Sequence, residues 1–368
     1  MKKLALTLGF LFLSSLTHAE DAVYRAVIDG HINALISVQT NDGEISGKVQ
    51  FDTSGADDIR LTGKPGAPGH FKWEEDLGKP TGTFTGTLAP DGKSGQGTWT
   101  SANGKKRFPL ALSRVATIQD LEDKKNNAGV SYPQLDDPHF ARLNEQLAKN
   151  AREKFGAHVE LMKDIRADLA DQRSDPAMAE LLKGASAGTG CDLGSVTQGI
   201  ISILCATSEY TGGAHGNTYK EVLNYRVAAD GTVRPIGLWE LLKKPPANIR
   251  TLSRLILADL KRHEASGASD NPSGNGSFIN FQGFPKVART GSEKYPSFTE
   301  TVAKGDIVFS VVPAGLAFEF DPYEMGSYDE GSFRVVVPNS ELAALYRRDG
   351  PLADRTAASQ PAARKPAR

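Results

Sequence analysis

One short segment of the chain brings together a hydroxyl, a carboxylate and an imidazole, the groups that hydrolytic enzymes combine. Ser208, Glu209 and His215 all lie between residues 208 and 217. A histidine base can activate a serine only when the two side chains come within about 3 Å. Three of the five residues 212–216 are glycine, which predicts a tight hairpin on which these side chains need not converge. Hydrolysis by these three residues is therefore the weak alternative, and we expect His215 to bond to backbone.

Other sequence patterns that are typical of enzymes occur here with the wrong secondary structure around them or with the wrong spacing. Residues 184–188 spell Gly-Ala-Ser-Ala-Gly, the letters of a nucleophile elbow, but the preceding residues 178–183 have a helical pattern where that motif needs a strand. The seven histidines are scattered without metal-ligand spacing, and the glycines of residues 188–194 do not have the dinucleotide-binding spacing. We expect a protein that is not an enzyme, with no catalytic residue, metal or cofactor.

The beginning of the chain and its cysteines predict export. Residues 1–19 have a basic start, an apolar run over residues 4–13 and a small-residue ending at Ala19, which is the layout of a signal peptide. The apolar run is shorter than the roughly 20 residues that span a bilayer, and no cysteine follows it for lipid attachment. The only two cysteines, Cys191 and Cys205, should join in an oxidising compartment. We expect a periplasmic or secreted protein without a membrane span.

Charge and length restrict the partners and the number of domains. The chain has 43 basic and 44 acidic residues, a formal net charge of −1, so nothing in its electrostatics favours nucleic acid. Its 368 residues exceed what one hydrophobic core usually supports. We expect two domains.

Residues 20–116 predict an all-β domain. Short alternating runs are separated by turn sequences such as Asn-Asp-Gly at 41–43, Asp-Gly at 91–92 and Asn-Gly at 103–104. This pattern is typical of an antiparallel meander closed as a small barrel or packed as a sandwich. Its large aromatic side chains either fill the core, which we favour, or line a ligand cavity; they are Phe71, Trp73, Phe84 and Trp99.

A charged connector at residues 117–129 is expected to link this domain to an α+β domain over residues 130–347. Phe140, Leu143, Leu147 and Ala151 recur at helical spacing, and a second amphipathic helix is predicted over about residues 248–263. Strands are predicted at residues 199–210, 219–227, 307–312, 316–320 and 332–337, and a short last helix up to residue 346. The serine- and glycine-rich residues 266–277 should be a loop, and residues 348–368 a disordered tail.

Two loop sequences in this second region resemble a known family. The segment 208–217 contains Tyr-Thr-Gly-Gly-Ala-His-Gly, and residues 320–328 read Phe-Asp-Pro-Tyr-Glu-Met-Gly-Ser-Tyr. In this order they resemble the extracytoplasmic domain shared by the lysozyme-responsive anti-sigma factor RsiV and the peptidoglycan deacetylase PdaC. Shorter matches accompany them; they are residues 130–133, 224–225, 235–242, 315–316, 331 and 335–338.

The resemblance covers about residues 128–347, and three departures limit what it implies. The chain has no sigma-binding region with a membrane helix and no deacetylase domain, so neither of those activities carries over. The segment between Cys191 and Cys205 is unlike that of the simplest members. What the resemblance implies is binding, because in the anti-sigma relative such loops engage the lysozyme cleft.

The resemblance leads us to expect one partner-binding surface formed by the two loops. Its contact residues would be Ser208, Tyr210, Thr211, His215, Pro322, Tyr323 and Tyr328. Acidic side chains around them would complement a cationic lysozyme; they are Glu209, Asp321, Glu324, Asp329 and Glu330. We expect a non-enzymatic envelope protein that binds a lysozyme-like or other cell-wall-associated protein, as an inhibitor or sensor. The alternative is an accessory protein that binds peptidoglycan or another carbohydrate, a role motivated by Trp73 and Trp99.

Overall fold

The structure is a computed structural model that describes residues 21–41, 43–51, 59–168, 182–196, 199–212, 215–266, 298–324, 328 and 331–356. The expected signal peptide lies outside these residues. So do nearly all of the serine-rich loop and residues 357–368 of the expected tail.

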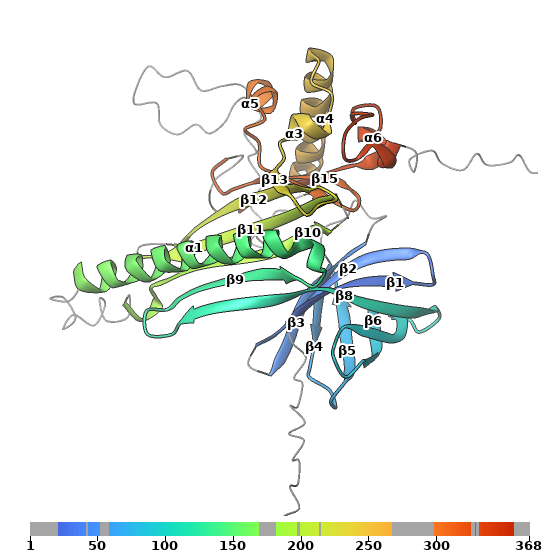
Figure 1. The fold of residues 1–368 in the computed structure, drawn as a ribbon, viewed down its shortest axis with the longest axis vertical. Helices are drawn as coiled ribbons and strands as arrows, with labels where there is room; N and C mark the ends of the chain where they lie inside the picture. The colour runs from blue at the N-terminus through green and yellow to red at the C-terminus, as the bar shows by residue number, and fades with distance from the viewer. Residues whose placement is uncertain are drawn as a thin grey trace, which may run out of the picture.

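The first part of the chain is a meander of eight antiparallel strands that closes on itself (Figure 1). The strands are β1 (Ala22–Ile28), β2 (Ile32–Asn41), β3 (Glu44–Phe51), β4 (Ile59–Gly63), β5 (His70–Asp76), β6 (Pro80–Leu88), β7 (Ser94–Ser101) and β8 (Arg107–Asp123). Pairing of β1 with β8, for example Ile28 with Leu110, closes the barrel. Its interior is apolar, with Ile36, Leu61 and Phe84 fully buried. The expected class, an all-β meander followed by an α+β region, is confirmed.

Strand β8 continues past the barrel, and this differs from the connector expected at residues 117–129. Residues 117–123 complete β8 and pair with β9 (Ala128–Leu135), so only the turn at residues 124–127 joins them. Ala116 and Ile118 are buried while Asp120 and Glu122 are exposed. These four side chains point to the same side of β8, which is buried at Ala116 and Ile118 and open to solvent further along, where the acidic residues lie without breaking the ladder.

The second part extends the same sheet and covers it with a long helix. The sheet runs through β9, β10 (Ser186–Val196), β11 (Ile200–Tyr210), β12 (Asn217–Val227) and β13 (Val233–Pro235). All its neighbours are antiparallel except β9 and β10. After a short 3₁₀ turn η1 (Pro138–Phe140), helix α1 (Ala141–Asp168) lies along this sheet and buries Leu143 and Leu147 against it (Figure 1).

A separate three-stranded sheet packs beside the first. It is formed by β14 (Phe309–Val312), β15 (Gly315–Phe320) and β16 (Phe333–Pro338). The helices on this side of the molecule are α3 (Leu238–Leu241), α4 (Pro246–Ser266), α5 (Phe298–Lys304) and α6 (Asn339–Leu342), followed by the 3₁₀ turn η4 (Ala353–Thr356). They enclose one apolar core with the three strands. No helix in the described part of the chain combines the length and the apolar character needed to cross a membrane.

Buried polar side chains join the two sheets. Ser202 Oγ donates to Asn224 Oδ1 at 2.6 Å and accepts from the Val311 N–H at 3.0 Å, while Asn224 Nδ2 donates to the Phe309 carbonyl at 2.8 Å. These bonds fix β14 against β11 and β12. Asn224 belongs to one of the short sequence matches, and its role here is to hold the two sheets in register.

The expected disulfide is present between Cys191 and Cys205. These residues are direct cross-strand partners in β10 and β11, so the bond links two paired strands rather than the ends of a loop. The sequence does not reveal β10, because its Ser, Gly, Thr and Cys residues lack apolar alternation.

Candidate functional site

The two loops singled out in the sequence leave their sheets at neighbouring points. The first joins β11 to β12, whose last pair is Glu209 with Asn217, and residues 213–214 at its tip lie outside the described residues. Gly212 adopts a φ of 106°, which favours glycine and permits the sharp reversal. The second loop joins β15 to β16 after the pair Phe320 with Phe333.

Three rings from these loops form one cluster, which we call the ring cluster: His215, Tyr323 and Tyr328. The His215 and Tyr328 rings are stacked, with centroids 3.6 Å apart and planes 16° apart. The Tyr323 ring lies 5.5 Å from Tyr328 and 6.5 Å from His215. The structure thus places residues more than 100 positions apart in contact, the condition on which a shared surface depends.

Hydrogen bonds orient the histidine within the ring cluster. His215 Nδ1 lies 3.0 Å from the Gly216 carbonyl, and because a carbonyl only accepts, Nδ1 carries the proton. In the neutral ring Nε2 is then an acceptor, and the Tyr323 hydroxyl donates to it at 3.4 Å. Tyr328 completes the arrangement by donating its hydroxyl to the same Gly216 carbonyl at 2.6 Å. The expected bond from His215 to backbone is present.

Tyr323 and His215 are the exposed members of the ring cluster, and the backbone of Tyr323 is unusual. Its φ is 73°, in the left-handed region that residues with a side chain rarely occupy. Half of the residue remains accessible to solvent. A left-handed tyrosine costs on the order of 1 kcal/mol or more, and such strain concentrates at functional positions. In this conformation the Tyr323 ring is exposed to solvent while its hydroxyl remains hydrogen-bonded to His215.

The second loop is held by its own acidic residues. Both Asp321 carboxylate oxygens accept from the Lys220 backbone N–H, at 3.0 and 3.2 Å, and Glu324 Oε2 accepts from the Asp321 N–H at 2.8 Å. Burial raises the pKa of both carboxyl groups, and the bonds to backbone N–H partly offset that rise. Pro322, between them, is half-buried. Asp321 and Glu324 are therefore occupied in fixing the loop, while Asp329 and Glu330 lie outside the described residues.

The hydrolytic set does not assemble. Ser208 Oγ lies 3.4 Å from Thr218 Oγ1, and Glu209 accepts from the Tyr219 hydroxyl at 3.2 Å. His215 bonds to Gly216 and Tyr323 instead, as described above. Each of the three side chains has partners of its own, so this geometry contains no serine hydroxyl positioned for the imidazole to deprotonate.

The remaining predicted contact residues lie around the base of the first loop. Tyr210 ends β11 and is half-buried, Thr211 is the first loop residue and is exposed, and Ser208 is exposed on the strand. They border the ring cluster in sequence, but only His215, Tyr323 and Tyr328 are joined in it.

Sequence reasoning missed a buried histidine beneath the same strands. His158 of α1 is 5% exposed, and its Nε2 lies 2.8 Å from Thr189 Oγ1, which in turn lies 2.8 Å from Thr207 Oγ1. Its Nδ1 lies 3.8 Å from Glu209 Oε1. Burial lowers the pKa of His158, aided by Lys154 and opposed by Glu209. The available signal was its position on the apolar face of α1, between Ala151 and Met162.

No metal centre is evident in the described residues, where no group of three or more His, Cys, Asp or Glu side chains is arranged to hold an ion. In the barrel, Phe71, Trp73 and Phe84 are buried core residues, as favoured from the sequence, and Phe71 and Trp73 also border a cavity. Trp99 is partly buried and donates its Nε1–H to Glu75 Oε1 at 3.0 Å.

Comparison with known proteins finds similarity to solved structures, including two DUF3298 family proteins. No protein-family profile matches the chain, and no curated protein matches it. A DUF3298 family protein from Bacteroides fragilis is 16% identical with a TM-score of 0.38, over 66% of this chain and 98% of its own. A DUF3298 family protein from Pseudomonas aeruginosa is 16% identical with a TM-score of 0.32, over 63% and 92%. DUF3298 denotes a domain of unknown function, and these matches do not test the resemblance to RsiV and PdaC.

Proposed function

We propose that the ring cluster is the centre of a docking surface for a lysozyme-like or other cell-wall-associated protein, and that the chain acts without catalysis as its inhibitor or sensor. The observation that carries this proposal is the meeting of two loops, from two different sheets, in one stacked set of rings. Tyrosine rings held rigidly lose little conformational entropy on binding, and they are enriched among the residues that dominate interface energies.

The exposure and hydrogen bonding of the loop side chains indicate which of them can contact a partner. The Tyr323 ring is half exposed, whereas the carboxylates of Asp321 and Glu324 accept bonds from backbone N–H groups. The acidic complementarity expected for a cationic lysozyme therefore does not rest on these two residues. We propose that the ring of Tyr323 provides most of the binding energy by inserting into an apolar or aromatic cleft of the partner.

The same proposal places the protein in the cell envelope, in the periplasm or outside the cell. Its support is the disulfide between Cys191 and Cys205, a bond that persists in oxidising compartments. The export segment at residues 1–19 is the second support, from the sequence alone.

The test is calorimetric titration of the protein, without residues 1–19, with a purified animal lysozyme, together with a turbidity assay of cell-wall lysis. We expect saturable binding with one partner per chain and slower lysis. Tyr323→Ala removes the ring, and because alanine also carries a Cβ it adds no new steric cost at the left-handed position. A central aromatic contact contributes about 2 kcal/mol or more, which corresponds to a roughly 30-fold weaker affinity.

Leu77→Ala is the matched control. Leu77 is 52% exposed, close to the 50% of Tyr323, but it lies in the β5–β6 turn of the barrel. It should leave the affinity unchanged. Absence of binding heat together with unslowed lysis would end the proposal for lysozyme, and equal losses in the two variants would show that the contact is nonspecific.

Two rival functions have their own tests. A wall-binding protein should sediment with purified sacculi, whereas a lysozyme binder should stay in the supernatant. Trp73 is almost completely buried inside the barrel, where a wall polymer cannot reach it. Hydrolysis by Ser208, Glu209 and His215 would require His215→Ala to abolish an activity that the unmodified protein shows.

A further inference from the structure

The barrel contains a cavity of about 320 Å³, separate from the ring cluster. It lies at the end of the barrel where the β2–β3, β4–β5 and β6–β7 connections meet, because its lining comes from the residues flanking those turns and from β1 and β8. Its volume is at the lower end of the range, about 300–1,000 Å³, of sites that take small organic molecules. Towards the other end the interior is filled by side chains such as Leu61 and Phe84.

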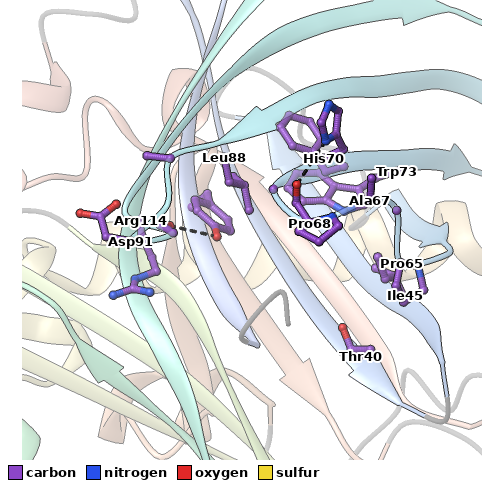
Figure 2. A pocket seen from close by; sticks show the side chains of 16 residues that line it. Thr40, Ile45, Pro65, Ala67, Pro68, His70, Trp73, Leu88, Asp91 and Arg114 are labelled. Atoms are coloured by element: carbon purple, nitrogen blue, oxygen red, sulfur yellow. Dashed lines mark hydrogen bonds between the residues drawn. The ribbon is translucent and has the colours of Figure 1, made fainter. Parts of the chain in front are cut away.

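The walls of the cavity are mainly apolar and aromatic. Phe71 and Trp73 are stacked with centroids 4.4 Å apart, and the Tyr24 ring lies 6.1 Å from Trp73. Ile45 and Leu88 complete the apolar lining. Figure 2 shows Asp91 and Arg114 on one side of the view and Trp73, Pro68 and Ile45 on the other. Protein interiors rarely leave gaps larger than a water molecule, so this cavity is much larger than an ordinary packing gap.

The charged groups at the cavity are already paired with protein groups. Arg114 Nε donates to Asp136 Oδ2 at 2.8 Å, and Asp91 Oδ1 accepts from the Lys93 N–H at 3.0 Å. The Tyr24 hydroxyl donates to the Gly92 carbonyl at 3.2 Å. A charged ligand would compete with these pairs, whereas an uncharged one would not.

The loop over the cavity is fixed in place. Residues 65–69 read Pro-Gly-Ala-Pro-Gly, and the Gly69 carbonyl accepts from the Leu88 N–H at 2.7 Å. The His70 N–H donates to the Ala67 carbonyl at 2.8 Å, and Gly69 adopts a φ of 76° that favours glycine. Two prolines and these bonds hold the loop before any ligand arrives, which lowers the entropy cost of binding.

We propose that this cavity binds a small, uncharged, predominantly apolar molecule, packed against the apolar lining to which Phe71, Trp73 and Leu88 contribute. The site is independent of the proposed docking surface, since it lies in the barrel and shares no residue with the ring cluster.

The experiment uses N-phenyl-1-naphthylamine, an uncharged aromatic probe that fluoresces when it leaves water. The full protein should enhance its emission with saturation at one probe per chain. Leu88→Trp fills the cavity and should weaken probe binding at least tenfold. Thr87→Trp is the matched control, because neighbouring strand residues face opposite sides and Thr87 is exposed; it should change the affinity less than twofold. Ala67→Phe, in the exposed loop over the cavity, gives a second blocking variant that leaves the core untouched and should also lower the affinity.

A displacement series tests the ligand class. Dodecanol should displace the probe at a concentration at least tenfold lower than dodecanoate. Absence of saturable enhancement, equal binding by folded Leu88→Trp and Ala67→Phe, or a preference for the carboxylate would each overturn the proposal.

Discussion

Replacing Glu319 with glutamine should destabilise the protein far more than removing an ion pair on its surface. Glu319 lies on β15, and its side chain is almost completely buried. Lys220 Nζ lies 3.0 Å from its Oε2, and Arg334 Nε lies 3.2 Å from its Oε1. The single carboxylate therefore pairs with two cations, one on β12 and one on β16, beside the loop that carries Tyr323.

The expected loss in the free energy of unfolding can be estimated from the burial of these side chains. Removing one partner of a buried ion pair costs about 3–5 kcal/mol, because the remaining charge stays desolvated. Lys220 and Arg334 are each about one-fifth exposed and regain some water, which places the Glu319→Gln loss near the lower figure of about 3 kcal/mol. Lys220→Met leaves Glu319 paired with Arg334, so it should cost less, about 1–3 kcal/mol. The double variant should lose less than the sum of the two single losses.

Urea unfolding followed by circular dichroism measures these losses. Lys154→Met is the control, because it removes the Lys154–Glu221 pair, whose side chains are 35% and 46% exposed and whose contribution should stay below about 1 kcal/mol. A Glu319→Gln loss no larger than that of the control, or strictly additive losses in the double variant, would refute the reasoning that this carboxylate joins the strands.

Three further outcomes follow from the structure. Cys205→Ser, which opens a disulfide spanning 14 positions, should lower the free energy of unfolding by about 3 kcal/mol in the chain-entropy model, measured by urea unfolding without reductant. The lowered pKa of His158 means that the unfolded chain binds more protons as pH falls below about 6.5, so stability should fall there, and His158→Gln should lose less stability than the unmodified protein between pH 7.5 and 5.5. Tyr328→Phe removes the hydroxyl that bonds to Gly216 and should cost about 1 kcal/mol in thermal unfolding, with a matching increase in hydrogen exchange of the β11–β12 loop. A larger pH loss for His158→Gln, or unchanged exchange for Tyr328→Phe, would contradict these assignments.

Local sequence signals identify most strands of the barrel but not its closure. Gly43, Gly92 and Gly104 are the glycines of the predicted turn sequences, and all three adopt positive φ. Pairing between β1 and β8 joins residues more than 80 positions apart, such as Ile28 and Leu110. No local pattern encodes that pairing, so the sequence leaves a barrel and a sandwich open.

For the ring cluster too, the sequence predicts the two turns but not the contact between them. The glycines predict the first hairpin, and the Pro322–Tyr323 sequence marks a second turn. Their contact depends on the packing of two separate sheets, which the buried bonds of Ser202 and Asn224 establish. Resemblance to a family suggested that the loops act together; the residues alone do not contain that information. The sequence also does not predict the hydrogen bond between Thr189 and Thr207, because each is a single polar residue within a strand.

The barrel and the second part of the chain share a core, and this follows from strand alternation. Ala34 and Ile36 of β2 point into the barrel, whereas Leu35 between them packs outward in the same cluster as Leu143 of α1. Arg25 of β1 also donates to the Val196 carbonyl at the end of β10, at 2.6 Å. The outer face of these barrel strands is therefore covered by the elements that carry the ring cluster. Since that face is apolar, its burial stabilises the protein only while both parts are present, so separating the barrel from the second part should destabilise both.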